Sequence, residues 1–350
     1  MKESNSQARR GVVNIFKLTR ELVDIPSLTS DEREVGLFLA SYLDELGYRV
    51  ELQELEEGRS NVIATTADAA PRVMLSTHMD TVPPHIPSSE DAQFIYGRGS
   101  CDAKGIIAAQ VAAAERLRAE GINELGLLFT VDEEMGSRGA ALLNKHPLAR
   151  NCCYMINGEP TDNRLAVGTK GSLRLILKTR GRAAHSAYPE QGESAIEKLL
   201  DVLRDVRACE WPGDSSLGET TCNIGVIKGG TRSNVIPAEA EADLQLRLVT
   251  EGGPVREILE RAVGGRAEIS YLSEAAPIRL VTLDGFEQCA VRFMTDIPHL
   301  SNWGAPLLLG PGSILVAHTD EERINKQELE QAVELYTRLV HTLLKKSGES

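Results

Sequence analysis

The chain has 350 residues, of which 42% are hydrophobic and 25% are charged, and its formal net charge is −13. This composition is typical of a folded globular protein and argues against a disordered chain or a coiled coil. The acidic excess and the lack of a basic tract argue against nucleic acid or an anionic membrane surface as a partner.

The cysteines and the apolar runs bear on where the protein works. The six cysteines are sparse and irregularly spaced, and no apolar run reaches the roughly 18 residues of a membrane helix. Residues 1–10 also lack the apolar stretch of a secretory signal. We therefore expect a cytoplasmic protein with reduced thiols and no membrane segment.

The first half of the chain alternates between helical patterns and short apolar runs. Ser30 or Asp31 is a suitable cap for the second helix. The predicted elements are two helices within 11–46 that are separated at Pro26, strands at 49–55, 61–65 and 72–76, a helix at 105–121, and strands at 126–131 and 155–157. Continuous apolar strands that alternate with helices predict an α/β domain with a largely parallel sheet.

The pattern changes near Gly168. The next elements are a strand at 172–179, a helix at 194–209, strands at 222–228 and 238–249, a helix at 253–263 and a strand at 267–272. This β-α-β-β-α-β order is the ferredoxin-like split unit. The chain then returns to an apolar strand at 306–309 and a final helix at 325–345. We therefore predict an α/β domain formed by residues 1–170 and 276–350, with a smaller α+β domain, residues 171–275, inserted in it.

Histidine and carboxylate side chains gather where the predicted strands and glycine loops end. They are His78 and Asp80, Asp102, Glu133 and Glu134, Glu159, and His318. Each alone has an ordinary explanation, such as a helix cap for Asp102 or a solvated acidic loop for residues 132–134. Sites in open α/β sheets form at the carboxyl ends of strands. Together, two histidines and three carboxylates suit two zinc ions with one bridging carboxylate, which leaves Glu133 over as a candidate general base.

These motifs resemble the di-zinc family of acetylornithine deacetylase, succinyl-diaminopimelate desuccinylase, aminoacylase and glutamate carboxypeptidase, in order along nearly the whole chain. The motifs that carry the resemblance are His78-x-Asp80, Gly-Arg-Gly-x-x-Asp102-x-Lys-Gly, Glu133-Glu134, Gly-Glu159-Pro, Gly-x-x-x-His185 and, as the last in the chain, the motif histidine His318. The resemblance implies a zinc-peptidase-like catalytic domain with an inserted lid, and a homodimer formed through the lid.

The resemblance also implies a role for each motif residue. One zinc ion would be held by His78, Asp102 and Glu159. The other would be held by Asp102, Glu134 and His318, so that Asp102 bridges the two. Asp80 would orient His78, and Glu133 would be the general base.

Three residues of the inserted domain match family positions that touch the substrate. His185 would reach the site of the partner subunit and stabilise the oxyanion that forms there. Asn234 and Arg247 would bind substrate, and the planar guanidinium of Arg247 suits a carboxylate.

The expected activity is hydrolysis of the amide bond of an N-acyl amino acid, as in acetylornithine deacetylase, with zinc replaceable by cobalt or manganese. A dipeptidase, a carboxypeptidase or a succinyl-diaminopimelate desuccinylase of the same family is the alternative. A catalytically silent binding protein on the same scaffold would lack a ligand, and none is missing. A ferredoxin-like module that binds nucleic acid would need a basic, aromatic strand face, which the sequence does not offer.

Overall fold

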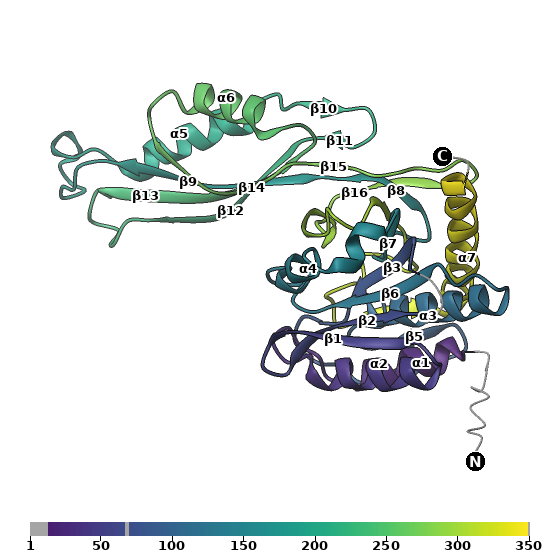
Figure 1. Ribbon diagram of the computed structural model, residues 1–350. Helices are drawn as coiled ribbons and strands as arrows, with labels where there is room; N and C mark the ends of the chain where they lie inside the picture. The colour runs from purple at the N-terminus through teal and green to yellow at the C-terminus, as the bar shows by residue number, and fades with distance from the viewer. Residues whose placement is uncertain (1–12, 67–69, 349–350) are drawn as a thin grey trace, which may run out of the picture. The chain divides into compact units, whose positions relative to one another are not determined.

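The computed structural model describes residues 13–66 and 70–348. The chain divides into two compact units (Figure 1). The first unit comprises the chain up to Ala166, Leu280–Cys289 and the part from Thr295 onward, and the second comprises Val167–Arg279 and Ala290–Met294. The second unit thus takes in a short later segment besides the single insertion that we predicted. Residues 1–10, where we expect no secretory signal, and the start of the predicted helical region lie outside the described residues.

The first unit is built on a six-stranded sheet in which β6, β3, β7 and β17 run parallel, and the β1–β2 hairpin extends it antiparallel. In sheet order the strands are β1 (Arg49–Glu56), β2 (Arg59–Thr65), β6 (Leu125–Thr130), β3 (Val73–His78), β7 (Tyr154–Asn157) and β17 (Ala305–Leu308). Every residue of β3 and β6 is buried. Because successive side chains point to opposite faces of a sheet, both faces of these strands are covered.

Helices supply that cover, and they share one apolar core with the sheet. The helices of this unit are α1 (Ile15–Asp24), α2 (Arg33–Glu45), α3 (Lys104–Ala119), α4 (Arg138–Leu143), α7 (Lys326–Gly348) and the 3₁₀ turns Pro147–Asn151 and Ile297–His299. The first unit also contains a small sheet of three strands: β4 (Ser89–Glu90), β5 (Phe94–Tyr96) and β18 (Arg323–Asn325). The predicted α/β class with a mainly parallel sheet is confirmed. None of the described helices is long and apolar enough to cross a membrane.

The predicted cap of helix α2 is wrong. Ser30 has a left-handed backbone with φ of 86°, and Glu32 takes the N-cap position without a side-chain hydrogen bond to the helix. The carboxylate of Glu32 turns instead to Arg59, whose Nε and Nη2 atoms donate to it over 2.7 and 2.8 Å. The side chain of Glu32 therefore forms a buried ion pair with Arg59 and does not cap the helix.

The second unit is a four-stranded antiparallel sheet in the order β12-β13-β9-β14, with two helices and its own apolar core. Its main elements are β9 (Gly171–Arg180), α5 (Ala195–Arg207), β12 (Thr221–Gly229), β13 (Glu239–Leu248), α6 (Gly252–Val263) and β14 (Glu268–Ala275). Alternate residues of β9 and β13 are buried, as expected of a sheet with one face against helices. This order confirms the predicted ferredoxin-like arrangement.

Three short strands lie where the chain passes from one unit to the other. They are β8 (Leu165–Thr169), β15 (Ile278–Arg279) and β16 (Gln288–Val291), in the sheet order β15-β8-β16. Thr169 pairs with Ile278 in an antiparallel register. The second unit also carries the β10 (Gly213–Asp214) and β11 (Gly218–Glu219) hairpin and the 3₁₀ turn Pro189–Gln191. All six cysteines are free thiols.

Candidate metal centre

The candidate ligands come from separate elements of the first unit. His78 is the last residue of β3, Glu134 follows β6, and Glu159 follows β7. Asp102 lies in the loop before α3, and His318 lies between β17 and β18. Because β3, β6, β7 and β17 run parallel, their carboxyl ends meet at one edge of the sheet, which is where open α/β sheets place their sites.

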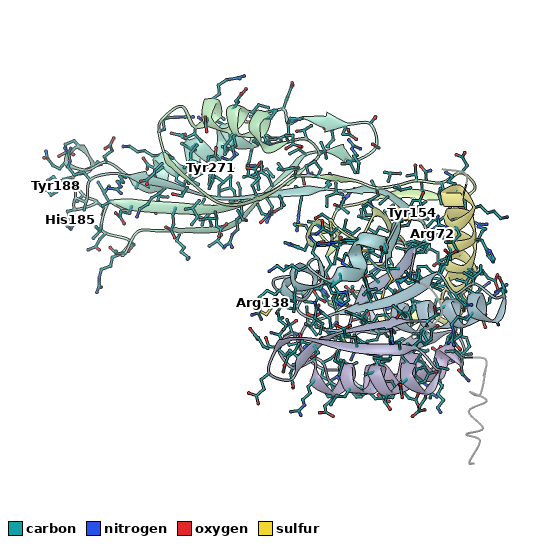
Figure 2. The ribbon with its side chains drawn as sticks, in the orientation of Figure 1. Arg72, Arg138, Tyr154, His185, Tyr188 and Tyr271 are labelled. Atoms are coloured by element: carbon teal, nitrogen blue, oxygen red, sulfur yellow. The ribbon has the colours of Figure 1, made fainter. Side chains whose placement is uncertain are left out.

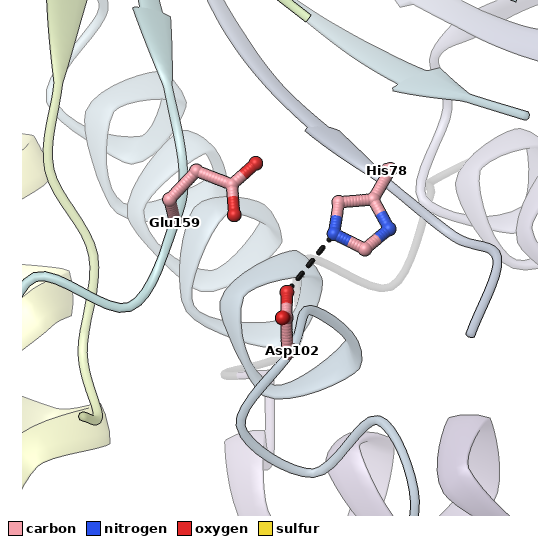
Figure 3. A group of neighbouring side chains, drawn as sticks. All are labelled: His78, Asp102 and Glu159. Atoms are coloured by element: carbon pink, nitrogen blue, oxygen red, sulfur yellow. Dashed lines mark hydrogen bonds and ion pairs between the residues drawn. The ribbon is translucent and has the colours of Figure 1, made fainter. Parts of the chain in front are cut away.

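The first ligand group consists of His78, Asp102 and Glu159. Their donor atoms all lie within 4.8 Å of one another, and all three residues are buried. Nε2 of His78 is 3.0 Å from Oδ1 of Asp102. In Figure 3 the imidazole ring and the two carboxylates face a common space between their three elements.

The second ligand group shares Asp102 with the first and adds Glu134 and His318, again with donor atoms within 4.8 Å of one another. Nε2 of His318 lies 2.9 Å from Oε1 of Glu134 and 3.4 Å from Oδ2 of Asp102. One oxygen of Asp102 thus faces each histidine. This is the arrangement that a carboxylate needs to bridge two cations.

The electrostatics of this cluster fit divalent cations. Burial raises the pKa of Glu159 well above its ordinary value, and the carboxylates of Glu133 and Asp102 raise it further. Oε1 of Glu159 is buried and has no hydrogen-bond partner within residues 13–66 and 70–348. Hydrogen bonds to Asp102 and Glu134 raise the pKa of His318 to about 10. Buried carboxylates that face two histidines, with one oxygen that has no hydrogen-bond partner among the described residues, form an oxygen and nitrogen donor set suited to a divalent metal ion.

Asp80 lies beside His78 and contacts both its ring and the loop that carries Glu133 and Glu134. The Nδ1–H of His78 donates to the backbone carbonyl of Asp80 over 3.0 Å and lies 3.5 Å from its carboxylate. With Nδ1 occupied in this way, Nε2, the atom that lies 3.0 Å from Oδ1 of Asp102, is the ring nitrogen that could coordinate a metal ion. The Asp80 carboxylate itself accepts hydrogen bonds from the backbone N–H groups of Glu133 and Glu134, over 3.1 and 3.2 Å, and from the Thr29 hydroxyl over 2.8 Å. Asp80 therefore connects the end of β3 to the loop that carries Glu133 and Glu134.

Glu133 does not belong to either ligand group. Burial raises the pKa of its carboxyl well above the ordinary value, and the carboxylates of Asp296 and Glu134 add to this, while His78 lowers it. A carboxylate with a raised pKa holds a proton more firmly, which suits a group that must accept one near neutral pH.

Asp132, the first of the three consecutive acids, is held by two arginines that sequence reasoning missed. Its backbone is left-handed, with φ of 71°. Arg59 donates to its Oδ1 over 2.8 Å, and Arg138 donates to both of its oxygens over 2.9 and 3.0 Å. Burial alone would raise the pKa of Asp132, and the hydrogen bonds from Arg138 and Arg59 outweigh it and lower the value to about 2. Asp132 is therefore a charged structural anchor for the loop that carries Glu133.

His185 and Asn234 lie on neighbouring loops of the second unit. The backbone N–H of Ser186 donates to the carbonyl of Asn234 over 3.0 Å, and His185 forms an isolated bridge with Val235. Figure 2 shows His185 beside Tyr188, with ring centroids 6.4 Å apart. Nδ1 of His185 accepts from the backbone N–H of Ala187 over 3.1 Å, so the neutral ring carries its proton on Nε2.

Arg247 lies in β13 and is half-buried. Across the two described stretches of chain, no hydrogen bond or ion pair engages its guanidinium.

Comparison with known proteins gives three kinds of match: a family profile, a similar sequence and solved structures of the same fold. The sequence profile of "Peptidase family M20/M25/M40" matches residues 74–342. A protein of Aspergillus terreus named "Probable carboxypeptidase" is 40% identical, over 93% of this chain and 85% of that protein. Two solved structures share the fold: an aminopeptidase from Bacillus cereus (TM-score 0.76, 23% identity, 93% of this chain and 98% of that chain), and a dinuclear metal-binding peptidase from Bacillus subtilis (TM-score 0.69, 14% identity, 95% and 98%).

Proposed function

The chain belongs to peptidase family M20/M25/M40 and is a metal-dependent hydrolase, and on this premise we propose that it cleaves the amide bond of a short peptide or an N-acyl amino acid. The observation that carries the proposal is the shared carboxylate of Asp102. One oxygen lies 3.0 Å from Nε2 of His78 and the other lies 3.4 Å from Nε2 of His318.

Two divalent ions would be held by the five ligands of these two groups, with zinc as the proposed metal and cobalt or manganese as substitutes. Such ions supply Lewis acidity, which polarises an amide carbonyl and makes water a nucleophile at neutral pH. Asp102 would help to hold both ions, because it is common to both groups.

Glu133 is the proposed general base. It accepts a proton from the attacking water and passes it to the nitrogen of the leaving amine. Its backbone N–H is fixed by Asp80 over 3.1 Å, and its neighbour Asp132 is fixed by two arginines. This support holds the backbone of the base in place, as a group that transfers a proton in a defined geometry requires.

His185 is the proposed oxyanion donor, contributed to the site of a partner subunit in a homodimer formed through the second unit. The hydrogen bond from the backbone N–H of Ala187 to Nδ1 supports this role. In the neutral ring it leaves the N–H at Nε2 as the hydrogen-bond donor. Asn234 lies on the adjoining loop, and Arg247 offers a guanidinium that no hydrogen bond or ion pair from the described residues engages. We assign to both a role in binding the substrate, with Arg247 directed to a carboxylate.

For the substrate, we favour a peptide with a free carboxyl terminus, because the relative at 40% identity is named a carboxypeptidase. Deacetylation of N-acetylornithine, the activity expected from the sequence, breaks the same type of bond and is the second candidate. The test is the zinc-loaded protein assayed against N-acylated dipeptides with free and amidated carboxyl ends, N-acetylornithine and N-succinyl-diaminopimelate.

The outcomes separate the candidates. Cleavage of the free peptide but not of its amide supports a carboxypeptidase, and Arg247→Gln should then raise KM more than it lowers kcat. Exclusive cleavage of N-acetylornithine would replace the carboxypeptidase with the deacetylase. No hydrolysis of any amide by a protein shown to hold two ions would refute the proposed activity.

A further inference from the structure

Glu322 is a buried carboxylate that belongs to neither ligand group. Its Oε1 atom accepts hydrogen bonds from the backbone N–H groups of Gly99, Cys101 and Asp102, over 2.9, 3.2 and 3.1 Å. Its side chain has no exposed surface. Three donors of one loop thus converge on a single oxygen, and one of them is the amide of the proposed bridging ligand.

The other oxygen of Glu322 is held by Arg98. The Nη1 atom of Arg98 donates to Oε2 over 2.6 Å and to the backbone carbonyl of Thr319 over 3.1 Å, and its Nε donates to the carbonyl of Pro84 over 3.3 Å. Arg98 is also buried. Thr319 directly follows His318, so this ion pair connects the Asp102 loop to the segment that carries the last metal ligand.

We propose that Glu322 is a positioning residue for the metal centre, which fixes the Asp102 loop and the His318 segment relative to each other. The inference rests on the proposed metal centre. Hydrogen bonds to a charged acceptor are about twice as strong as neutral ones. The Glu322 carboxylate therefore fixes the backbone from which the Asp102 side chain extends to both histidines.

The position of Asp102 matters more than that of any other ligand, because it serves both groups. A shift of its backbone changes the distance to His78 and to His318 together. Partners that orient metal ligands typically contribute about 10–100-fold to metal affinity. Loss of the Glu322 carboxylate should therefore weaken both ions and not only one.

The test compares Glu322→Gln with Glu321→Gln. The amide keeps the shape of the side chain and loses the charge that Arg98 and the three N–H groups require. Glu321 is the adjacent residue, with a side chain that is 88% exposed, and it serves as the matched control. Metal affinity is measured by competition with a chelator, and the absorption spectrum of the cobalt-substituted protein reports the ligand geometry.

We expect Glu322→Gln to lower the affinity for both ions by about 10–100-fold and to change the cobalt spectrum. Glu321→Gln should match the wild type in both. Circular dichroism of the metal-free proteins must show that both variants are folded. If Glu322→Gln does not fold, Arg98→Lys takes its place, because it keeps the positive charge and loses the geometry that reaches Thr319.

Two negative outcomes have different meanings. Wild-type affinity and spectrum in a folded Glu322→Gln, or in Arg98→Lys, would overturn the positioning role and leave the metal centre intact. Failure of the wild-type protein to bind any divalent ion would instead refute the proposed metal centre itself.

Discussion

Replacing Arg59 with methionine should destabilise the first unit far more than the same change at Arg138, although both arginines bind Asp132. The Arg59 side chain is 6% exposed and also binds Glu32, whose side chain has no exposed surface. The Arg138 side chain is 48% exposed. Both variants therefore remove an arginine that binds the Asp132 carboxylate, but one arginine is buried and the other is half-exposed.

The magnitude follows from what each change leaves behind. Without Arg59, Asp132 keeps two hydrogen bonds from the Arg138 guanidinium and one from the Arg138 backbone N–H. Among the described residues, Glu32 keeps only the backbone N–H of Ser30, at 3.2 Å. One buried carboxylate then lacks a counter-charge, which typically costs about 3–5 kcal/mol of unfolding free energy. Without Arg138, Asp132 still has Arg59, and a half-exposed pair contributes about 0–1 kcal/mol.

The assay is urea unfolding of the metal-free protein, followed by tryptophan fluorescence. The chain has two tryptophans. Trp303 is fully buried, belongs to the first unit and donates to the carbonyl of Leu143 in α4, over 3.1 Å. A Trp211→Phe background makes it the only probe, so the transition reports the first unit alone. Equal losses in Arg59→Met and Arg138→Met, or a loss below about 1 kcal/mol in Arg59→Met, would refute the reasoning from burial.

The remaining predictions concern the site. Zinc-loaded protein should approach two ions per chain by elemental analysis, and chelation should abolish hydrolysis until a divalent ion is restored. Glu133→Gln should keep its metal and lose about 10²–10⁴-fold in kcat, whereas Glu134→Gln should lose metal; the opposite pattern would show that the two roles are exchanged. Where subunits exchange, a mixture of inactive His185→Ala and Glu133→Gln should regain activity, because one hybrid site holds both intact residues, and a proven mixed dimer without recovery would argue for action within one chain. Finally, the pKa of Asp132 is lowered from 3.8 to about 2, so its stabilising effect is present above the unfolded-state value and is lost as the pH falls. The difference in unfolding free energy between the wild type and Arg138→Met should therefore shrink between about pH 4 and pH 2, and an unchanged difference would contradict this.

Local sequence patterns predict the fold well where one element is determined by its own residues. The apolar runs at 72–76 and 126–131 predict buried strands because no alternation with polar residues is present, and the structure buries every position of β3 and β6. The N-cap position of Glu32, in place of the predicted Ser30 or Asp31, could not be predicted, because the side chain of Glu32 binds Arg59, which lies 27 residues away in another element.

The histidines and carboxylates that cluster at the sheet edge could be predicted from the sequence, because each follows a strand or a glycine loop. The residues that hold these side chains in place could not be predicted. Arg59 lies 73 residues from Asp132, and Glu322 lies 223 residues from Gly99. Neither residue has a local motif, since its partners are determined only when distant strands come together. Asp80 is an intermediate case: its spacing from His78 indicates the local contact, but its hydrogen bonds to the Glu133 loop depend on the neighbouring strand.

The antiparallel pairing of Thr169 with Ile278 has a consequence for how such a protein can be assembled by recombination. Cα atoms of directly opposed residues in an antiparallel pair lie about 4.5–5.5 Å apart, a gap that a two-residue hairpin turn closes. Residues between this pair hold most of the second unit and its separate apolar core. The residues between Thr169 and Ile278 could therefore be replaced by a short turn or by another domain while β8 and β15 remain paired. Recombination at this one position of the gene would exchange most of the second unit as a block.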